Sequence, residues 1–365
     1  MGDECVNKFT ALTWGRLLLP HAPAPILAER GAETHNKNHT LGEQRSMAIA
    51  SDGGPARGRF GELWRNLPRS ARALPLAAVL VPLSILALVG WLNWRAAWRN
   101  AEADILRAAE SVAEYGERAF ESYSLAAGRL NERLRGLADA EIRENERALH
   151  DELRRTGAEL TQTELAYVID REGRALIATN IFPVPREVSL ADRDYFQGLL
   201  SPDFPPAYVS RMFIGRFDGQ LLFSVARRRE DTGNPPAPDG FDGVVLVSVR
   251  PQTLAEGMRR LLHAPTDRMA LMRADGYAVS TTSGLLDQER PPPRVDPSSP
   301  YFKFADAGVE SAVYLSRTAT PGADALLAMH RIEGFPMYGV AIRPASEIVA
   351  GWWSVMSAQL ALAGC

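Results

Sequence analysis

Cysteine is nearly absent from this chain of 365 residues, since only Cys5 and Cys365 occur, at its extreme ends. A disulfide framework and a thiolate metal site of ordinary spacing are therefore excluded. Histidine is scarce as well: after the first hundred residues only His150, His263 and His330 remain, and no two stand at metal-ligand spacing. Hydrolase, Walker, zinc-protease, kinase and cyclase motifs are also missing, so we expect no catalysis by these residues.

An excess of charge of one sign is lacking too. The chain has 41 Lys and Arg against 44 Asp and Glu, a net charge of −3. This balance provides no basic footprint for nucleic acid. The hydrophobic content of 46% is enough for one or two domains with a proper core. Nothing in the sequence implies a cofactor.

One long segment carries no charge at all: residues 74–92 read LPLAAVLVPLSILALVGWL. About 20 apolar residues cross the ~30 Å hydrocarbon core of a bilayer as a helix. Arginines crowd the side before this segment, and three tryptophans, Trp91, Trp94 and Trp98, suit an interfacial belt at its other end. We therefore predict a transmembrane helix over 73–93, an uncleaved signal anchor with the preceding residues in the cytoplasm and the following residues outside. A cleaved signal peptide and a buried core helix are the alternatives.

The two ends of the chain flank the exported part. Residues 1–72 show no sustained period and no catalytic motif, and we expect a cytoplasmic, mostly disordered segment, with Met47 a candidate for the true start. After Glu347 the chain carries no further charge, and a tryptophan pair stands near the start of this run. We interpret 346–365 as a second membrane helix on a chain cut off before its next domain. A buried or amphipathic terminal helix is the alternative.

A helical pattern follows the anchor. Apolar residues recur at 4-3-4-3 spacing from Ile105 to Leu130, and the other faces are rich in Glu and Arg. We predict one long helix over 94–160, broken at most once, whose stripe partly covers a sheet. Its membrane-proximal part could pair with a second protomer to form a homodimer. The simpler alternative is an amphipathic helix packed only on its own domain.

An internal repeat occupies the rest of the exported part. Residues 166–179 read AYVIDREGRALIAT and residues 269–282 read MALMRADGYAVSTT, two short strands around an acidic and glycine-containing turn. In both copies a Tyr-Phe pair and then an apolar hairpin follow. This order predicts two tandem modules, over 161–262 and 263–345. The expected fold class is α+β: a long helix and two PAS-like antiparallel-sheet modules, flanked by transmembrane helices.

This layout resembles the double-Cache sensor domains that form the extracytoplasmic halves of many bacterial histidine kinases, diguanylate cyclases and chemoreceptors. The resemblance covers about residues 94–364 and rests on ADRDYFQ, on the hairpin FSVARRR…GFDGVVLVSV and on the repeated D-x-x-G or D-G strand pairs. It implies a periplasmic domain whose membrane-distal module binds a small ligand between its sheet and the overlying loops. The signal would pass through the membrane helices to a kinase or cyclase output domain.

The resemblance also implies site residues. Amino-acid-binding members of the family carry an Arg-x-Trp-Tyr motif, to which Arg193, Tyr195 and Phe196 correspond here. A guanidinium can hold both oxygens of a ligand carboxylate. Those members also place an Asp in the closing strand for the ligand ammonium, where this chain has Ser248. Since a serine cannot supply that charge, an organic acid or another small anion is favoured over an α-amino acid.

Strand parity adds candidates independently. Alternate residues of a strand face opposite sides, so the all-apolar faces of the first hairpin should pack on the long helix. This leaves Ser224, Ser248 and Arg228, rather than Arg227, facing the ligand loops. Tyr208, in the loop before the hairpin, is a further candidate.

Plainer interpretations accompany these hypotheses. Arg193 could simply pair with Asp192 or Asp194, and residues 227–229 could form a solvated strand end. For the whole chain we favour a membrane-anchored sensor of a small anionic ligand. The alternatives are a ligand-free, membrane-tethered scaffold acting by dimerisation and, without any supporting motif, a tethered hydrolase.

Overall fold

A computed structural model of the chain describes residues 69–157, 164–262, 264–284, 286, 290–320 and 323–363. The chain divides into two units, Met1–Arg72 and Ala73–Cys365. The predictions about segment 1–72, including a start at Met47, fall almost wholly outside the described residues. The following description concerns the second unit.

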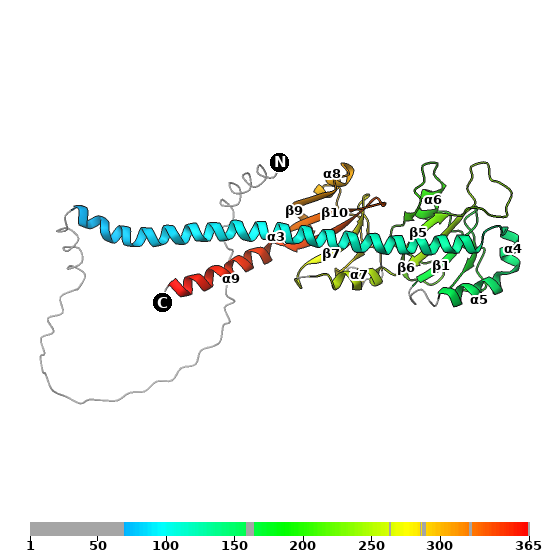
Figure 1. Cartoon of the computed structure of the whole chain (residues 1–365), viewed down its shortest axis with the longest axis horizontal. Coiled ribbons are helices and arrows are strands. Elements are labelled where there is room, and N and C mark those ends of the chain that lie inside the picture. Colours follow the sequence, from blue (N-terminus) through cyan, green and yellow to red (C-terminus); the bar gives the residue numbers. More distant parts are fainter. Residues whose placement is uncertain are drawn as a thin grey trace, which may run out of the picture. The chain divides into compact units, whose positions relative to one another are not determined.

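The elements of this unit are a very long helix, two sheets and several shorter helices (Figure 1). The helices are α3 (Arg69–Arg133), α4 (Asp139–Glu144), α5 (Glu146–Gly157), α6 (Asp194–Leu200), α7 (Pro251–Arg259), α8 (Pro300–Asp306) and α9 (Ala345–Ala363). The strands are β1 (Glu164–Ile169), β2 (Ala175–Ala178), β3 (Tyr208–Val209), β4 (Phe213–Ile214), β5 (Leu221–Arg228) and β6 (Val244–Val249) in the distal module, and β7 (Arg268–Arg273), β8 (Ala278–Thr281), β9 (Ser311–Thr320), β10 (Ala323–Ile332) and β11 (Met337–Pro344) in the proximal module.

Helix α3 joins the predicted anchor to the predicted stalk without interruption. Its span Ala77–Arg133 is the one helix within the described ranges that is long and apolar enough to cross a membrane. The large apolar side chains between Val79 and Leu92 are mostly exposed, which argues against a buried core helix. Further along, the predicted stripe lies on both sheets, with Ile105 fully buried.

The helix predicted over 94–160 was expected to be broken at most once, but it is interrupted twice, after Arg133 and at Asn145. The chain turns at Gly136, whose φ of 76° is a left-handed conformation that glycine adopts without a steric penalty. Two separate helices, α4 and α5, follow the turn. The stripe did not reveal this change because Leu134 and Leu137 keep the helical spacing across the turn.

The two modules share one sheet topology. The strand order is β2-β1-β6-β5-β3 in the distal module, where β4 also pairs with β5, and β8-β7-β11-β10-β9 in the proximal module. All neighbouring strands are antiparallel. The α+β fold class with two tandem antiparallel modules is therefore confirmed.

The internal repeat extends to single hydrogen bonds. In the distal module the Thr179 hydroxyl accepts the backbone N–H of Ala166 at 2.9 Å. In the proximal module the Thr282 hydroxyl accepts the N–H of Met269 at the same distance. The glycine in each intervening turn has a φ of 82° or 85°. Both copies thus close their first strand pair in the same way.

Each sheet has one face on α3 and the other under a short helix, α6 or α8. In the distal hairpin, Phe223 and Val225 belong to the core along α3, whereas Ala226 lies in the separate core beneath α6. The predicted packing of the apolar faces on the long helix is confirmed. Phe120 of α3 touches both modules, with its ring centroid 6.2 Å from that of Phe223 and 5.5 Å from that of Phe335.

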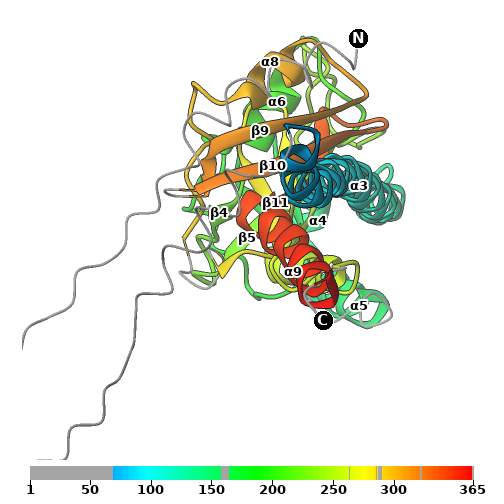
Figure 2. The same cartoon turned by 90° about the vertical axis from the view of Figure 1, so that its left-hand side faces the viewer.

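Helix α9 continues directly from β11 and runs back beside α3 (Figure 2). The Asn93 amide donates to the Gln359 amide oxygen at 3.2 Å, and the Trp352 indole N–H donates to the Gly90 carbonyl at 3.1 Å. The segment 346–365 is thus helical as far as the structure describes it, and its insertion in a membrane stays a prediction.

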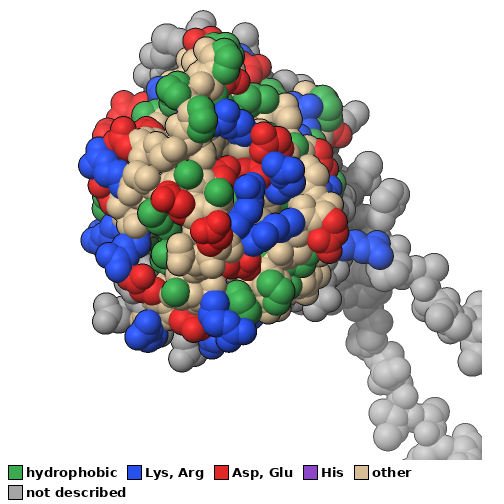
Figure 3. Space-filling model, turned by 90° about the vertical axis from the view of Figure 1, so that its right-hand side faces the viewer, with side chains coloured by type: hydrophobic (Ala, Val, Ile, Leu, Met, Phe, Trp, Pro, Cys, Tyr) green, Lys and Arg blue, Asp and Glu red, His purple; other side chains and the backbone are tan. Residues whose placement is uncertain are grey.

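Basic and acidic side chains are interspersed at the end of the distal module that lies farthest from the predicted anchor (Figure 3). Several ion pairs occur in this module, among them Arg171 with Asp242 and Arg186 with Glu146. One basic side chain of the module, Arg229, is almost completely buried.

Gly339 in β11 marks a close approach between α3 and the proximal sheet. A Cβ atom at this position would lie 2.4 Å from the backbone nitrogen of Ala113 and 2.6 Å from the Ala109 carbonyl oxygen. Because backbone atoms cannot rotate away, we expect Gly339→Ala to cost about 1–3 kcal/mol of stability, measured by native-state hydrogen exchange of β10 and β11. Gly351→Ala is the control, since its Cβ would meet nothing within 4 Å. Equal stability of the two variants would refute the close approach.

Candidate functional site

All seven predicted site residues lie on α6, at its ends, or on the face of the distal sheet that it covers. The helix lies against β5 and β3, opposite to α3. Ser224 and Ser248 face its side of the sheet, because their strand neighbours Phe223 and Val249 pack on α3. The structure therefore assembles the predicted set in one region.

Arg193 immediately precedes α6 and has spare hydrogen-bonding capacity. Its Nη2 donates to the Ile214 carbonyl at 2.8 Å, and its guanidinium carbon lies 4.7 Å from the centroid of the Phe213 ring. Its Nε is buried and has no hydrogen-bond partner within the described residues. Burial lowers the pKa of Arg193, because desolvation disfavours the charged form. A partly buried cation with an N–H that lacks a described partner is suited to an anionic ligand.

The plainer pairing of Arg193 with a neighbouring carboxylate is not what the structure shows. Asp192 is held by Arg216 through two contacts of 2.9 and 2.6 Å, and these hydrogen bonds lower the pKa of Asp192. Asp194 accepts the backbone N–H of Arg211 at 2.7 Å. Both carboxylates thus have other donors.

The two serines form a polar pair in an otherwise apolar part of the sheet. Ser224 and Ser248 are cross-strand neighbours with their hydroxyl oxygens 2.8 Å apart, and both residues are buried. The backbone N–H of Ser224 donates to the Ser210 hydroxyl at 2.8 Å. The pair is uncharged, and its two hydroxyls are hydrogen-bonded to each other.

Tyr195 and Phe196 shape the region from inside the core. Both are buried, and they pack on Phe213 and Phe241 with ring centroids 5.9 and 5.2 Å apart, respectively. Burial raises the pKa of the Tyr195 hydroxyl. These aromatic rings hold α6 against the sheet.

Arg228 shares the α6 face, as parity predicted, whereas Arg227 lies against Gly128 of α3. The Nε of Arg228 donates to the Leu199 carbonyl at 2.6 Å, and its guanidinium carbon is 3.6 Å from the centroid of the Phe204 ring. It therefore caps the carboxyl end of α6, where cationic donors satisfy free carbonyls.

Tyr208 lies in the short strand β3, against Gly198 of α6. Its hydroxyl accepts a hydrogen bond of 3.2 Å from Arg273, which belongs to the proximal module. Phe213 and Arg273 were not among the predicted residues. Strand β4, with Phe213, has only two residues and shows no period, and no local pattern links Arg273 to a strand 65 positions earlier.

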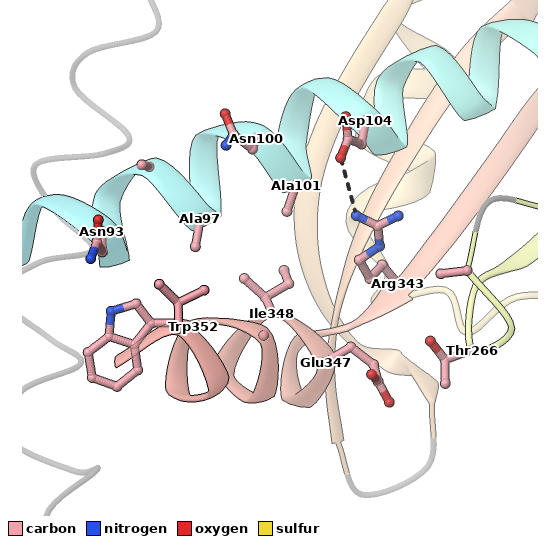
Figure 4. A pocket seen from close by; sticks show the side chains of 14 residues that line it. Asn93, Ala97, Asn100, Ala101, Asp104, Thr266, Arg343, Glu347, Ile348 and Trp352 are labelled. Carbon is pink, nitrogen blue, oxygen red and sulfur yellow. Dashed lines mark ion pairs between the residues drawn. The ribbon is translucent and has the colours of Figure 1, made fainter. Parts of the chain in front are cut away.

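A separate cavity of about 480 Å³ lies between α3 and α9 (Figure 4). Small side chains, Ala97 and Ala101, line its α3 wall, and Ile348 faces them from α9. At the end near the sheet, Arg343 is 3.8 Å from Asp104. No cluster of three or more His, Cys, Asp or Glu that could hold a metal ion occurs within the described ranges.

Two antiparallel sheet modules of one topology lie along a shared helix, which is a tandem PAS-like architecture. The sequence model of the Cache domain matches residues 94–352, and the chain belongs to this family. Cache domains are extracellular sensor domains that serve as input modules. The predicted double-Cache resemblance is confirmed.

Several solved structures are similar to this chain, and the first of them shares its fold. The extracellular domain of the candidate histidine kinase rpHK1S-Z16 is 20% identical, with a TM-score of 0.53, over 70% of this chain and 99% of that one. The ligand-binding domain of the Campylobacter jejuni chemoreceptor Tlp3, in complex with L-valine, is 12% identical, with a TM-score of 0.47 over 70% and 98% of the two chains. That of the Pseudomonas aeruginosa chemoreceptor PctB, in complex with L-Arg, is 13% identical, with a TM-score of 0.46 over 67% and 95%. No curated protein sequence matches this chain.

Proposed function

We propose that this protein is a membrane-anchored extracytoplasmic sensor of a small anion, in particular an organic acid bound beside Arg193 in the distal module. The proposal rests on one observation: the buried Nε of Arg193 has no hydrogen-bond partner within the described residues. A carboxylate could accept hydrogen bonds from this guanidinium and neutralise its charge.

The charges around Arg193 support an anion rather than an α-amino acid. Its two acidic neighbours already accept hydrogen bonds from Arg216 and from the backbone of Arg211. In the closing strand, Ser248 offers only an uncharged hydroxyl that is paired with Ser224. A ligand ammonium would therefore find no carboxylate at the position where the amino-acid-binding relatives provide one.

The signal would leave the domain through the membrane helices toward a histidine kinase or diguanylate cyclase output domain. For this to happen, the ligand must bind two conformations of the sensor with unequal affinity. Insertion of α3 and α9 in a bacterial inner membrane is part of the proposal.

A ligand-free scaffold that dimerises through the long helix has less support. From Ile105 to Leu130 the apolar stripe of α3 packs against the modules of its own chain. Little of this stripe is left to pair with a second protomer, and dimerisation stays a prediction.

Arg193→Ala should weaken ligand binding about 10- to 100-fold, because a hydrogen bond to a charged group contributes about 1.5–3 kcal/mol. The full chain in nanodiscs would first be screened by thermal shift against citrate, malate, succinate, phosphate and the common amino acids. Affinities of the stabilising compounds would then be measured by calorimetry. Arg317→Ala, which removes an exposed arginine of the proximal module, is the matched control.

Two results would count against the proposed function. One is that no compound stabilises the unsubstituted chain. The other is that the Arg193→Ala variant binds as tightly as the Arg317→Ala variant.

A further inference from the structure

We propose that Arg273 of the proximal module holds the ligand-site elements of the distal module and relays their movement along β7 to the membrane helices. This inference rests on the proposed function, because it concerns how occupancy of the distal site leaves that module. It is carried by two groups of ion pairs, one at each end of β7.

The first group joins the modules directly. Arg273 is the last residue of β7, and its side chain is only 13% exposed. Its Nη2 donates to the Tyr208 hydroxyl at 3.2 Å, and its Nη1 donates to the carbonyl of Val209. The same Nη1 lies 3.9 Å from the carboxylate of Asp194, the first residue of α6. One guanidinium of the proximal module thus contacts both β3 and α6.

Asp275 completes this group from the turn after β7. Its carboxylate accepts hydrogen bonds from the Nε of Arg273 at 3.1 Å and from the Nη2 of Arg211 at 3.0 Å. Burial acts to raise the pKa of Asp275, but the hydrogen bonds from the two arginines bring it below its ordinary value. Asp275 therefore ties an arginine of each module into one cluster.

The weakest contact in the cluster is the one nearest to the proposed ligand. The 3.9 Å between the Asp194 carboxylate and Nη1 of Arg273 is too long for a hydrogen bond, whereas Arg273 donates hydrogen bonds to Tyr208 and Asp275. Burial raises the pKa of Asp194. Because Asp194 follows Arg193 directly, a ligand that moves Arg193 would lengthen or close this contact.

The second group lies at the opposite end of the same strand. Asp267, which precedes β7, accepts two hydrogen bonds from Arg343, at 2.8 and 2.7 Å. Arg343 is the penultimate residue of β11, which leads directly into α9, and it also approaches Asp104 of α3 (Figure 4). Arg343 therefore links Asp267 to α3 through its side chain, and it is joined to α9 through the chain itself.

Strand β7 lies between the two groups, and all of its residues are paired with a neighbouring strand. All six of its residues pair with β11, from Arg268 opposite Ile342 to Arg273 opposite Met337. At about 3.3 Å per residue, six residues span about 20 Å. Since a paired strand is stiff along its length, displacement of its distal end is transmitted to Asp267 and Arg343.

Native-state hydrogen exchange on the full chain in nanodiscs tests this coupling without any ligand. Asp194→Asn, a change in the distal module, should speed exchange of amides in 267–273 and 343–350 about tenfold, which corresponds to about 1.4 kcal/mol. Conversely, Arg273→Ala should speed exchange in 194–200 and 208–214 to a similar extent. Asp324→Asn, which breaks an exposed ion pair of the proximal module, is the control and should leave all four segments unchanged.

Arg273→Lys keeps the charge but not the forked hydrogen bonds, and it should fall between Arg273→Ala and the unsubstituted chain. Arg273→Lys is also the variant to measure if Arg273→Ala does not fold. Changes confined to the module that carries the substitution would overturn the proposal, because a merely local ion pair would give that pattern. If these variants showed no coupling between the modules, the proposed ligand site at Arg193 would be unaffected. If the ligand screen found no ligand, the proposed coupling through Arg273 would be unaffected.

Discussion

Replacing Asp139 by alanine is expected to destabilise the distal module by about 3–5 kcal/mol, because it leaves a buried arginine without its carboxylate. The side chain of Arg229 is 1% exposed, and its Nη1 lies 2.7 Å from the Asp139 carboxylate. Apart from this carboxylate, its described hydrogen-bond partner is the carbonyl of Asp242 at 3.2 Å, and its Nη2 has none within the described ranges. An uncompensated charge in that position would have to be desolvated on folding.

Replacing the other member of the ion pair, Arg229, should lower the stability of the distal module much less. Arg229→Met removes the buried charge and replaces it with an apolar side chain of similar length. Asp139 is more exposed than its partner, and it retains the amide of Asn234, which donates to it at 2.9 Å. We therefore expect Arg229→Met to cost less than half as much as Asp139→Ala.

Native-state hydrogen exchange of β5 and β6 would measure both variants, since it reports on the distal module alone. Asp324→Asn is the control: Arg317 and Asp324 form an exposed pair, whose loss should change stability by less than about 0.5 kcal/mol. Equal costs for the two halves of the buried pair, or a greater cost for Arg229→Met, would contradict the account.

Phe120→Ala is the second substitution with a large expected effect, about 3–5 kcal/mol. Phe120 is fully buried on α3, where it touches Phe223 of the distal module and Phe335 of the proximal module. Its loss leaves a cavity in the core that both modules share. Protection from exchange should therefore fall together in the β5–β6 and β10–β11 hairpins.

Leu125→Ala provides the matched control on the same helix. Leu125 is 60% exposed, so its truncation removes little buried area and should change stability only slightly. If Phe120→Ala lowered protection in one hairpin only, Phe120 would not be a shared core residue. The same conclusion would follow if Leu125→Ala were equally costly.

The elements with strong periodicity could be predicted from the sequence. The apolar stripe from Ile105 to Leu130 predicted α3, and alternation predicted both hairpins and the side of the sheet on which Arg228 lies. The duplicated turns predicted two modules of one topology. Such patterns are local consequences of helix and strand geometry, so they can be recognised without knowing any long-range contact.

Elements with a weak pattern were missed. Strand β9, Ser311–Thr320, was not predicted because it lies at the edge of the proximal sheet. Several of its side chains are only partly buried, so its alternation of apolar and polar residues is weak. The end of α3 was misplaced because one glycine reverses the chain within a continuous helical spacing.

Only the tertiary structure decided the hydrogen-bond partners of each arginine in and around the candidate site. The sequence by itself made Arg193 and Arg228 candidates for the ligand site, Arg193 through the motif ADRDYFQ and Arg228 through strand parity, because both signals are local. Packing then engaged Arg228 with the carbonyls of α6, left the Nε of Arg193 without a described partner, and brought Arg273 to Tyr208. The physical reason is that a guanidinium donates its hydrogen bonds to whatever acceptors lie beside it in space, and these acceptors belong to strands and loops that are distant along the chain.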